Sequence, residues 1–547
     1  MTFNLSKAQP LNQKNEFTRQ DTLRGSIGKE RAWWDVTHYT IDVKPDINAK
    51  TISGKNSIDF RIINTGKKMQ IDLQEPMQID KVEYQNQELK YEREGNVYWL
   101  YFPVNLKVNS SQSITIYFSG KPMEAKRPPW AGGWIWKQDC NNNPFVSVAC
   151  QGLGASVWYP CKDHQSDEPD FGATLNITVP DTLVAVGNGK LTATIKNNDG
   201  TTTYTWNVTQ PINNYNIIPY IGKYINWTEV YNGEKGKLEV SYWFLACDEA
   251  KAKQHIPGGT DSTLKALEYW FGPYPFYEDG YKLVQSPHLG MEHQSAVAYG
   301  NKFLYGYLGR DLSGSGWGLR WDYITVHESG HEWFGNNITS KDIADMWIHE
   351  GITDYCETLY TDFYFGKKAG DEYVQGQRWG IGNNNPIIGS YGVNKEGSGD
   401  MYPKGANLMH TIRSIIDNDS LFRKILRGLN QKFYHKTVTS QDVENYIAVK
   451  GGVGLTKVFD QYLRTTQIPV LEYFTSEEKG KIILNYRWTN CIEGFNMPIK
   501  LPAGNGKMGY FLATEKWQKF KTNFITTDQL KEDMFDKNFY VEYKMAK

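Results

Sequence analysis

Two changes in the spacing of the apolar residues constrain the fold more than any other feature of the sequence. In the first part of the chain apolar and polar residues alternate, as at Ile58, Phe60 and Ile62, and this period of two is typical of strands with one buried face. Turn sequences such as Asn188-Gly189 separate the alternating segments, as in antiparallel sandwiches. We therefore expect residues 1–225 to form an N-terminal β-sandwich domain.

Helical spacing replaces this alternation after Trp243. One predicted helix carries a single apolar stripe, formed by Leu408, Met409, Ile412, Ile415 and Ile416. The segment Thr439-Ser440-Gln441-Asp442 offers hydroxyls that cap a helix N-terminus. Short alternating segments return near the C-terminus, and 547 residues are too many for one core. We expect a multi-domain α+β protein, with a mostly helical domain at residues 226–467 and a small β-domain at residues 468–547.

The charge and hydropathy of the chain exclude two classes of function. Sixty Lys and Arg residues stand against 61 Asp and Glu, so the formal net charge is -1 and no overall basic field attracts nucleic acid or anionic lipid. No apolar run approaches the roughly 18 residues that a membrane-spanning helix needs. We therefore expect neither a nucleic-acid partner nor a membrane partner.

The six cysteines do not form a disulfide scaffold, because they are too few for 547 residues and none stands in a C-x-x-C pair. Cys140, Cys150 and Cys161 lie close together in sequence, and they form either one bridge or free buried thiols. The segment Met1–Pro10 lacks the apolar core of a signal peptide. The protein is therefore either cytoplasmic or exported with its signal already removed, for example to a periplasm.

The strongest local signal is an H-E-x-x-H pattern formed by His327, Glu328 and His331. On a helix, positions i and i+4 lie on the same face, so two imidazoles can bind one metal ion while the glutamate lies beside it. The segment Gly335-Asn336-Asn337 is a plausible end for this helix. The alternative is a helix with two surface histidines and no metal.

Two acidic residues downstream favour the metal site. Catalytic zinc takes three protein ligands and keeps one open position, and Glu350, with eighteen residues between it and His331, is a candidate third ligand. Asp354 lies one helical turn after Glu350. It is either a carboxylate that accepts the distal N–H of a ligand histidine or a solvated acid on the helix surface.

This ligand spacing, within Trp347-Ile348-His349-Glu350-Gly351, resembles that of the M1 family of zinc aminopeptidases, the gluzincins that include aminopeptidase N and leukotriene A4 hydrolase. The segment 271–275 is similar to one that precedes the family's exopeptidase motif, G-x-M-E-N. Leu289-Gly290-Met291-Glu292-His293 stands where that motif is expected. Leu289 replaces its first Gly and His293 its Asn, while Glu292 is retained.

Further segments extend the resemblance over nearly the whole chain. Tyr402, in Met401-Tyr402-Pro403-Lys404-Gly405, matches a tyrosine that the family places near its metal, and Gln151 matches a Gln or Glu of the N-terminal domain. The resemblance implies a thermolysin-like catalytic domain between the two β-domains. The family's long helical C-terminal domain has no counterpart in the sequence.

The resemblance also implies a mechanism for peptide hydrolysis. One Zn²⁺ per chain, bound by His327, His331 and Glu350, activates a water molecule. Glu328 acts as the general base that takes the proton of this water and delivers it to the leaving amine. The Tyr402 hydroxyl stabilises the oxyanion.

An aminopeptidase must recognise the free N-terminus of its substrate, and the resemblance assigns this task to Glu292. Gln151 adds a neutral acceptor for the same amine, or is an amide satisfied within the first domain. The backbone of Gly290 and Met291 holds the peptide as an added strand. His293 is either a second polar contact or, as we favour, a packing substitute for Asn. Peptides are the expected partners, and the chain is expected to be a monomer.

Two other functions compete with this interpretation. A related branch of the family hydrolyses lipid epoxides at the same zinc, but the sequence displays no carboxylate-binding, lipid-shaped cavity. An inert binding module with a relic zinc site is the second alternative, and the intact Glu328 argues against it. The preferred first residue of the substrate stays open, because its pocket is built from scattered side chains.

Overall fold

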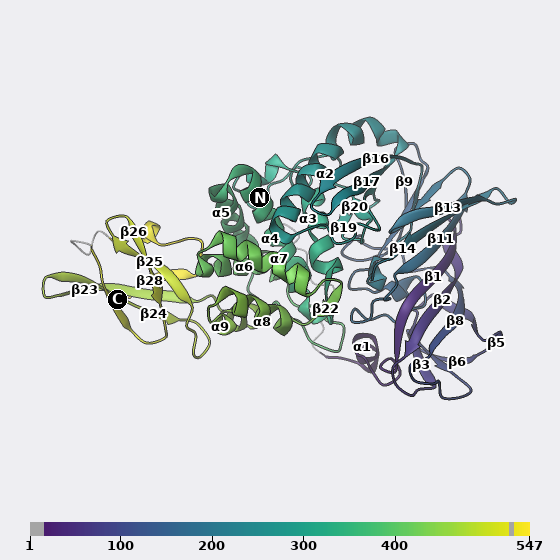
Figure 1. Ribbon diagram of the computed structural model, residues 1–547, viewed down its shortest axis with the longest axis horizontal. Coiled ribbons are helices and arrows are strands. Elements are labelled where there is room, and N and C mark those ends of the chain that lie inside the picture. Colours follow the sequence, from purple (N-terminus) through teal and green to yellow (C-terminus); the bar gives the residue numbers. More distant parts are fainter. Residues whose placement is uncertain (1–15, 524–529, 547) are drawn as a thin grey trace.

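The structure is a computed structural model that describes residues 16–523 and 530–546. Figure 1 shows three units side by side: a large β unit formed by the first third of the chain, a mostly helical unit, and a small β unit at the C-terminal end. This arrangement confirms the predicted multi-domain α+β fold. Residues Met1–Pro10, where no export signal is expected, lie outside the described residues.

The first unit is built from β-sheets that enclose one apolar core. Its main sheet has eight strands in the order β13-β14-β11-β1-β2-β8-β4-β5. These strands are β1 (Trp34–Asp46), β2 (Thr51–Ile62), β4 (Gln78–Tyr84), β5 (Gln87–Glu88), β8 (Ser111–Gly120), β11 (Ala173–Pro180), β13 (Lys190–Lys196) and β14 (Thr201–Val208). A short helix, α1 (Arg19–Gly25), precedes them.

Two smaller sheets complete the first unit. One has the order β12-β15-β10-β9 and the other β3-β7-β6. Their strands are β3 (Lys68–Asp72), β6 (Lys90–Glu94), β7 (Val97–Tyr101), β9 (Gly133–Gln138), β10 (Pro144–Ala149), β12 (Val184–Val186) and β15 (Tyr220–Gly222). Two 3-10 turns, η1 (Ala155–Val157) and η2 (Asn214–Asn216), lie between strands. The loop after β10 and the turn η2 both reach the second unit.

The predicted alternation is realised in the main sheet. Ile58, Phe60 and Ile62 on β2 are buried, whereas Asp59 and Arg61, which lie between them, are exposed to solvent. Gly189, in the predicted turn, adopts a φ of +69°, and a Cβ there would lie 2.0 Å from a backbone oxygen, so only glycine fits.

The second unit combines a five-stranded sheet, in the order β16-β17-β18-β20-β19, with helices. The strands are β16 (Tyr224–Gly233), β17 (Gly236–Leu245), β18 (Tyr281–Gln285), β19 (Gly290–Met291) and β20 (Val297–Tyr299), with a small pair β21 (Ile338–Ser340) and β22 (Lys436–Val438). The helices are α2 (Glu249–Phe271), α3 (Tyr323–Gly330), α4 (Trp347–Phe365), α5 (Lys367–Gly376), α6 (Pro403–Ile416), α7 (Asp419–Lys432), α8 (Ser440–Gly451) and α9 (Thr456–Arg464). The change of sheet at β16 lies near the predicted boundary at residue 225, and the boundaries themselves stay predictions.

Two helix predictions are confirmed. The stripe Leu408, Met409, Ile412 and Ile415 is buried on α6. Thr439 caps α8, because its side chain accepts a hydrogen bond from the Asp442 N–H and the Asp442 carboxylate accepts one from the Thr439 N–H.

The third unit packs directly against the helices. Its strands are β23 (Val470–Glu478), β24 (Lys481–Thr489), β25 (Pro498–Gly504), β26 (Lys507–Leu512), β27 (Gln518–Lys521) and β28 (Glu542–Met545). The buried residues of this unit and of the helical unit form one continuous core, and the Tyr462 hydroxyl on α9 donates to the Tyr540 carbonyl. Among the described residues, no helix is both long and apolar enough to cross a membrane.

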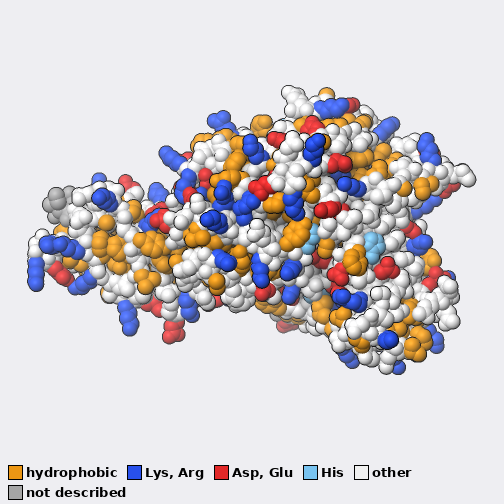
Figure 2. All heavy atoms as spheres, in the orientation of Figure 1, with side chains coloured by type: hydrophobic (Ala, Val, Ile, Leu, Met, Phe, Trp, Pro, Cys, Tyr) orange, Lys and Arg blue, Asp and Glu red, His pale blue; other side chains and the backbone are white. Residues whose placement is uncertain are grey.

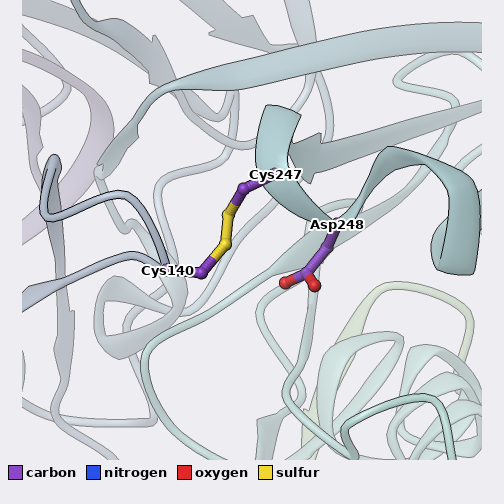
Figure 3. A group of neighbouring side chains, drawn as sticks. All are labelled: Cys140, Cys247 and Asp248. Carbon is purple, nitrogen blue, oxygen red and sulfur yellow. A yellow bond between two sulfur atoms is a disulfide. The ribbon is translucent and has the colours of Figure 1, made fainter.

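A disulfide joins the first and second units, and its partners differ from those expected. Cys140, in the turn between β9 and β10, is bonded to Cys247 in η3 (Ala246–Asp248), as Figure 3 shows. A bridge among Cys140, Cys150 and Cys161 is therefore wrong. Cys150 and Cys161 are buried free thiols, which was the other possibility that the sequence left open. Sequence proximity misled the prediction because the true partner is 107 residues away and comes close only through folding.

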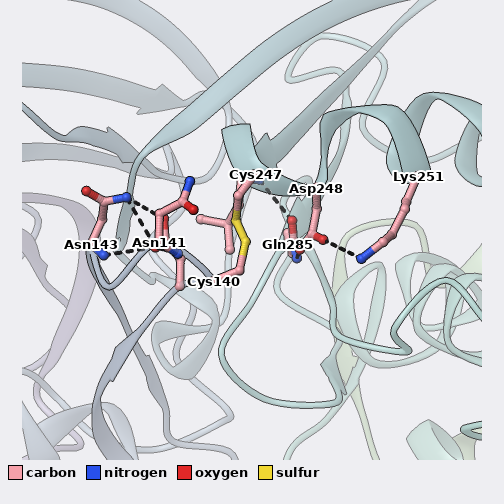
Figure 4. Close-up of a disulfide and its surroundings, with 9 residues drawn as sticks. Cys140, Asn141, Asn143, Cys247, Asp248, Lys251 and Gln285 are labelled. Carbon is pink, nitrogen blue, oxygen red and sulfur yellow. Dashed lines mark hydrogen bonds and ion pairs between the residues drawn. A yellow bond between two sulfur atoms is a disulfide. The ribbon is translucent and has the colours of Figure 1, made fainter.

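Asp248 lies beside the two sulfur atoms, but this group is no metal site because the sulfurs are bonded to each other. The Asp248 carboxylate instead accepts hydrogen bonds from Lys251 at 3.1 Å and from Gln285 at 2.8 Å (Figure 4). The disulfide thus fastens the β9–β10 hairpin to the second unit, and the Asp248 contacts connect η3 with α2 and β18 within that unit.

The surface carries no continuous field of one sign on the face drawn in Figure 2. Basic and acidic side chains are interspersed there, as the net charge of -1 predicts.

Candidate active site

Helix α3 presents the two histidines of the H-E-x-x-H pattern. The helix begins where the Asp322 side chain accepts a hydrogen bond from the Thr325 N–H. It ends at Gly330, earlier than the predicted stop at Gly335. His331 nevertheless keeps helical backbone angles, with φ of -64° and ψ of -20°, so both imidazoles remain on one face. The helix with two surface histidines is excluded, because His327 is 5 % and His331 1 % exposed.

Glu350, on the first turn of α4, completes a group of three ligand atoms. Its Oε2 atom lies 3.3 Å from His331 Nε2 and 3.8 Å from His327 Nε2. The three atoms lie within 4.8 Å of one another, and all three residues are buried. Two imidazole nitrogens and one carboxylate oxygen are the donor set that a catalytic zinc takes when one position stays open.

The remaining ring nitrogens of both histidines are already held, which leaves each Nε2 free for a metal. His327 Nδ1 donates to Glu357 Oε1 at 2.7 Å, and His331 Nδ1 donates to the Phe334 carbonyl at 3.0 Å. Such contacts fix the tautomer and the orientation of a ligand histidine. The donor set and its supports therefore fit a zinc ion.

The structure assigns to Glu357 the contact that we expected of Asp354. Glu357 lies two helical turns after Glu350 and is fully buried, and its Oε2 atom accepts hydrogen bonds from Tyr373 and Gln377. Asp354 lies beside it, buried and not solvated, and burial together with the charge of Glu357 raises its pKa. The i+7 spacing from Glu350 was the sequence signal that could have identified Glu357.

Charge and burial act against each other within this cluster. Burial raises the pKa of the Glu328 carboxyl to about 7, and the adjacent histidines oppose the rise. For Glu350 burial acts in the same upward direction, but the imidazoles of His331 and His327 hold its pKa below the usual range. Glu350 is therefore a carboxylate in this environment.

The motif that carries Glu292 lies directly against Glu328. Gly290 and Met291 form β19, which is the last strand of its sheet. This strand pairs with β20 along one edge only. A Cβ at Gly290 would lie 2.5 Å from Glu328 Oε1, so the absence of a side chain permits this approach. One edge of β19 thus stays available for pairing beside the metal ligands.

Glu292 itself lies near the predicted metal ligands. Its carboxylate, that of Glu328 and a ring nitrogen of His331 lie within 4.8 Å of one another. Burial raises the pKa of Glu292, and the charge of His331 opposes the rise. The departures from the family motif at Leu289 and His293 therefore leave Glu292 near the metal ligands.

His293 points away from this site. It is fully buried, and its Nδ1 shares a hydrogen bond with the Tyr220 hydroxyl of β15. The imidazole thus packs against the first unit, in agreement with the packing interpretation.

The first unit enters the site through Gln151, which lies two residues after β10. Its Nε2 atom donates to Glu292 Oε1 at 2.6 Å and to Glu350 Oε1 at 2.9 Å. Gln151 is therefore not satisfied within the first unit alone. It links the predicted amine-binding carboxylate to a predicted metal ligand.

Tyr402 immediately precedes α6 and contacts one of the predicted metal ligands. Its ring stacks on that of His327, with centroids 6.2 Å apart and an interplanar angle of 23°. Burial and the charge of Glu350 raise the pKa of the phenol well above its ordinary value. The hydroxyl is therefore protonated and able to donate.

Comparisons with known proteins agree with this geometry. The model of the peptidase M1 N-terminal domain matches residues 36–215, and that of the peptidase family M1 domain matches residues 260–462. The chain belongs to peptidase family M1. The second match contains the three predicted metal ligands of this M1 chain, and the first contains Gln151.

Named relatives and a solved structure extend the comparison. Aminopeptidase B of Rattus norvegicus is 24% identical over 315 residues, which cover 55% of this chain and 45% of the relative. Aminopeptidase N of the same organism is 24% identical over 436 residues, covering 70% of this chain and 43% of the relative. This M1 chain thus spans about half the length of the curated relatives or less.

A crystal structure of a mutant M1 zinc metallopeptidase from Deinococcus radiodurans has the same fold, with a TM-score of 0.68 at 19% identity. The match covers 81% of this chain and 97% of that one. The matched part of this chain is larger than the helical unit alone, so the similarity extends beyond that unit.

Proposed function

We propose that this chain is a zinc metallo-aminopeptidase that hydrolyses the N-terminal residue from peptides. The observation that carries the proposal is the position of Glu292, a buried carboxylate within 4.8 Å of Glu328 and His331. An acceptor beside the metal ligands suits a substrate whose ammonium group lies next to the bond that is cut.

His327, His331 and Glu350 would hold one Zn²⁺ per chain. When bound, zinc polarises the substrate carbonyl and makes a water nucleophile available near neutral pH. Glu357 orients the His327 ring, and the Phe334 carbonyl orients that of His331.

Glu328 is the proton carrier in this proposal. Its position immediately after a ligand histidine, with a buried carboxylate, suits it to take a proton from the attacking water and to deliver it to the leaving amine. Pairing of the substrate backbone with the free edge of β19, at Gly290 and Met291, would align the peptide past this carboxylate.

Tyr402 donates a hydrogen bond to the oxygen that becomes negative when the peptide carbonyl is attacked. We expect Tyr402→Phe to lower kcat by about 10²- to 10³-fold with little change in KM, because this donor acts on charge that exists only in the transition state. Steady-state kinetics with an aminoacyl chromogenic substrate measure both constants.

The matched control is Tyr355→Phe, which removes another buried hydroxyl, bonded to His410 at 3.0 Å and not to a predicted metal ligand. It should retain the wild-type kcat within a few-fold. If Tyr402→Phe changed KM alone, Tyr402 would bind substrate without stabilising the transition state.

Glu292 makes the enzyme an exopeptidase by binding the free α-amino group. We expect a peptide to be cleaved and its N-acetylated form to resist cleavage, because acetylation removes the positive charge and adds bulk at the Glu292 end of the site. Product analysis by mass spectrometry on the matched pair of peptides tests the proposal. Comparable cleavage of both peptides would make the enzyme an endopeptidase and would remove this role from Glu292.

A further inference from the structure

Glu292 receives a second hydrogen bond from the first unit, made by a tyrosine that the sequence analysis did not single out. The hydroxyl of Tyr215, on the turn η2, donates to Glu292 Oε1 at 3.0 Å. Tyr215 is 4 % exposed, so this contact is made inside the interface between the first and second units. The two residues lie 77 positions apart in the chain.

Both donors to the Glu292 carboxylate occupy the same oxygen. Gln151 Nε2 donates to Oε1 at 2.6 Å, beside the Tyr215 hydroxyl. In the part of the chain that the structure describes, no other side chain donates a hydrogen bond to Oε2, the second oxygen of this carboxylate. Two donors on one oxygen fix the rotation of a carboxylate and leave its other oxygen to accept a ligand.

The turn η2 is itself held rigidly. The Tyr159 hydroxyl donates to the Asn214 carbonyl at 2.9 Å, and Asn214 Nδ2 donates to the Lys162 carbonyl at 2.8 Å. Burial, together with the charge of Glu292, raises the pKa of the Tyr215 phenol, so its hydroxyl is a donor.

The same turn also fixes the backbone of Glu292. Asn216 Nδ2 donates to Asn336 Oδ1 at 2.6 Å, and Asn336 Nδ2 donates to the Glu292 carbonyl at 2.8 Å. Two residues of η2 therefore hold Glu292. Tyr215 contacts its side chain directly, and Asn216 contacts its backbone through Asn336.

We propose that Tyr215 is a positioning residue that fixes the Glu292 carboxylate with Oε2 directed at the amine of the substrate, and so strengthens the selection for a free N-terminus. This inference rests on the proposed function. Its consequence is specific: without the hydroxyl, Glu292 can rotate and the contribution of the amine to binding falls, whereas the metal ligands are unchanged.

The test compares two ligands of the zinc-loaded protein that differ only in the α-amino group. They are the hydroxamate of the amino acid that the wild type cleaves best and the corresponding hydroxamate without the amine, with affinities measured by calorimetry. A hydrogen bond to a charged group is typically worth a factor of about 10 to 100 in affinity. We therefore expect Tyr215→Phe to weaken the amino hydroxamate by about 10- to 100-fold and to leave the amine-free hydroxamate within about 2-fold.

Tyr224→Phe is the matched control. Tyr224, at the start of β16, is also buried and packs into the core of the first unit, and its hydroxyl donates to the Gln285 carbonyl at 2.8 Å rather than to Glu292. This variant should retain the wild-type ratio of the two affinities. Zinc content and melting temperature are measured for all variants, and Tyr215→Leu is a second variant without the hydroxyl if the phenylalanine protein cannot be recovered.

The possible outcomes separate the inference from the proposed function. If the wild type bound both hydroxamates equally, the amine-binding role of Glu292 would fail. If the wild type favoured the amino hydroxamate and the Tyr215 variants kept the same ratio, the positioning role would be overturned and the proposed function would stand. An equal loss of affinity for both ligands would also overturn it, because Tyr215 would then be merely structural.

Discussion

Glu328→Gln is expected to lower kcat by about 10⁴-fold while the protein keeps its zinc. General acid–base catalysis contributes about 10²- to 10⁴-fold, and we expect the upper end because one carboxylate carries the proton both from the water and to the leaving amine. The amide is nearly isosteric with the carboxylate but cannot accept this proton. Single-turnover kinetics and metal analysis on the same preparation measure the two effects.

The control for this prediction is Glu444→Gln. Glu444 is a buried carboxylate on α8 that pairs with Arg464 at 2.8 Å, far in sequence from the H-E-x-x-H segment. At equal metal content, we expect the kcat of the Glu444→Gln protein to stay within a few-fold of the wild-type value. Wild-type turnover in the Glu328→Gln protein would contradict the assignment of Glu328 as the proton carrier.

His331→Ala is expected to abolish zinc binding almost completely, and activity with it. His331 Nε2 lies 3.3 Å from Glu350 Oε2, so removing the imidazole takes away one of three predicted ligands and also one of the groups that contact the buried Glu350 carboxylate. Elemental analysis after dialysis gives the zinc content per chain. The expected values are about one ion for the wild type and close to none for the variant.

His410→Ala is the matched control, because it also removes a buried imidazole from the helical unit. His410 bonds to Tyr355 and Asn538 and is not among the predicted ligands. Its zinc content should equal that of the wild type in the folded protein. Full retention of zinc by His331→Ala would show that the metal is bound elsewhere.

The predictions that succeeded depend on residues close together in the chain. His327, Glu328 and His331 lie within two turns of one helix, and the alternation at Ile58, Phe60 and Ile62 lies within one strand. In both cases the geometry of the local backbone determines which side chains share a face. The period of the apolar residues therefore predicted the fold class, and the spacing of the two histidines predicted that they share one face.

The predictions that failed required knowledge of distances between segments. Asp354 was a candidate for the contact to a ligand histidine because it lies one turn after Glu350, but the way α4 packs against α3 brings Glu357 to the His327 ring instead. Likewise Cys140 was compared with its sequence neighbours, whereas folding brings Cys247 to it. Neither packing angle nor chain path can be read from local periodicity.

By itself, the sequence determined the order of β, helical and β units and the donor types and spacing of the candidate metal site, since these follow from backbone geometry over a few turns or strands. Only the tertiary structure decided how Glu292 is held. Gln151 and Tyr215 reach its carboxylate from a unit more than 70 residues earlier in the chain. Their contacts depend on burial at the interface between two units, where a desolvated carboxylate must find hydrogen-bond donors from whichever segments pack against it.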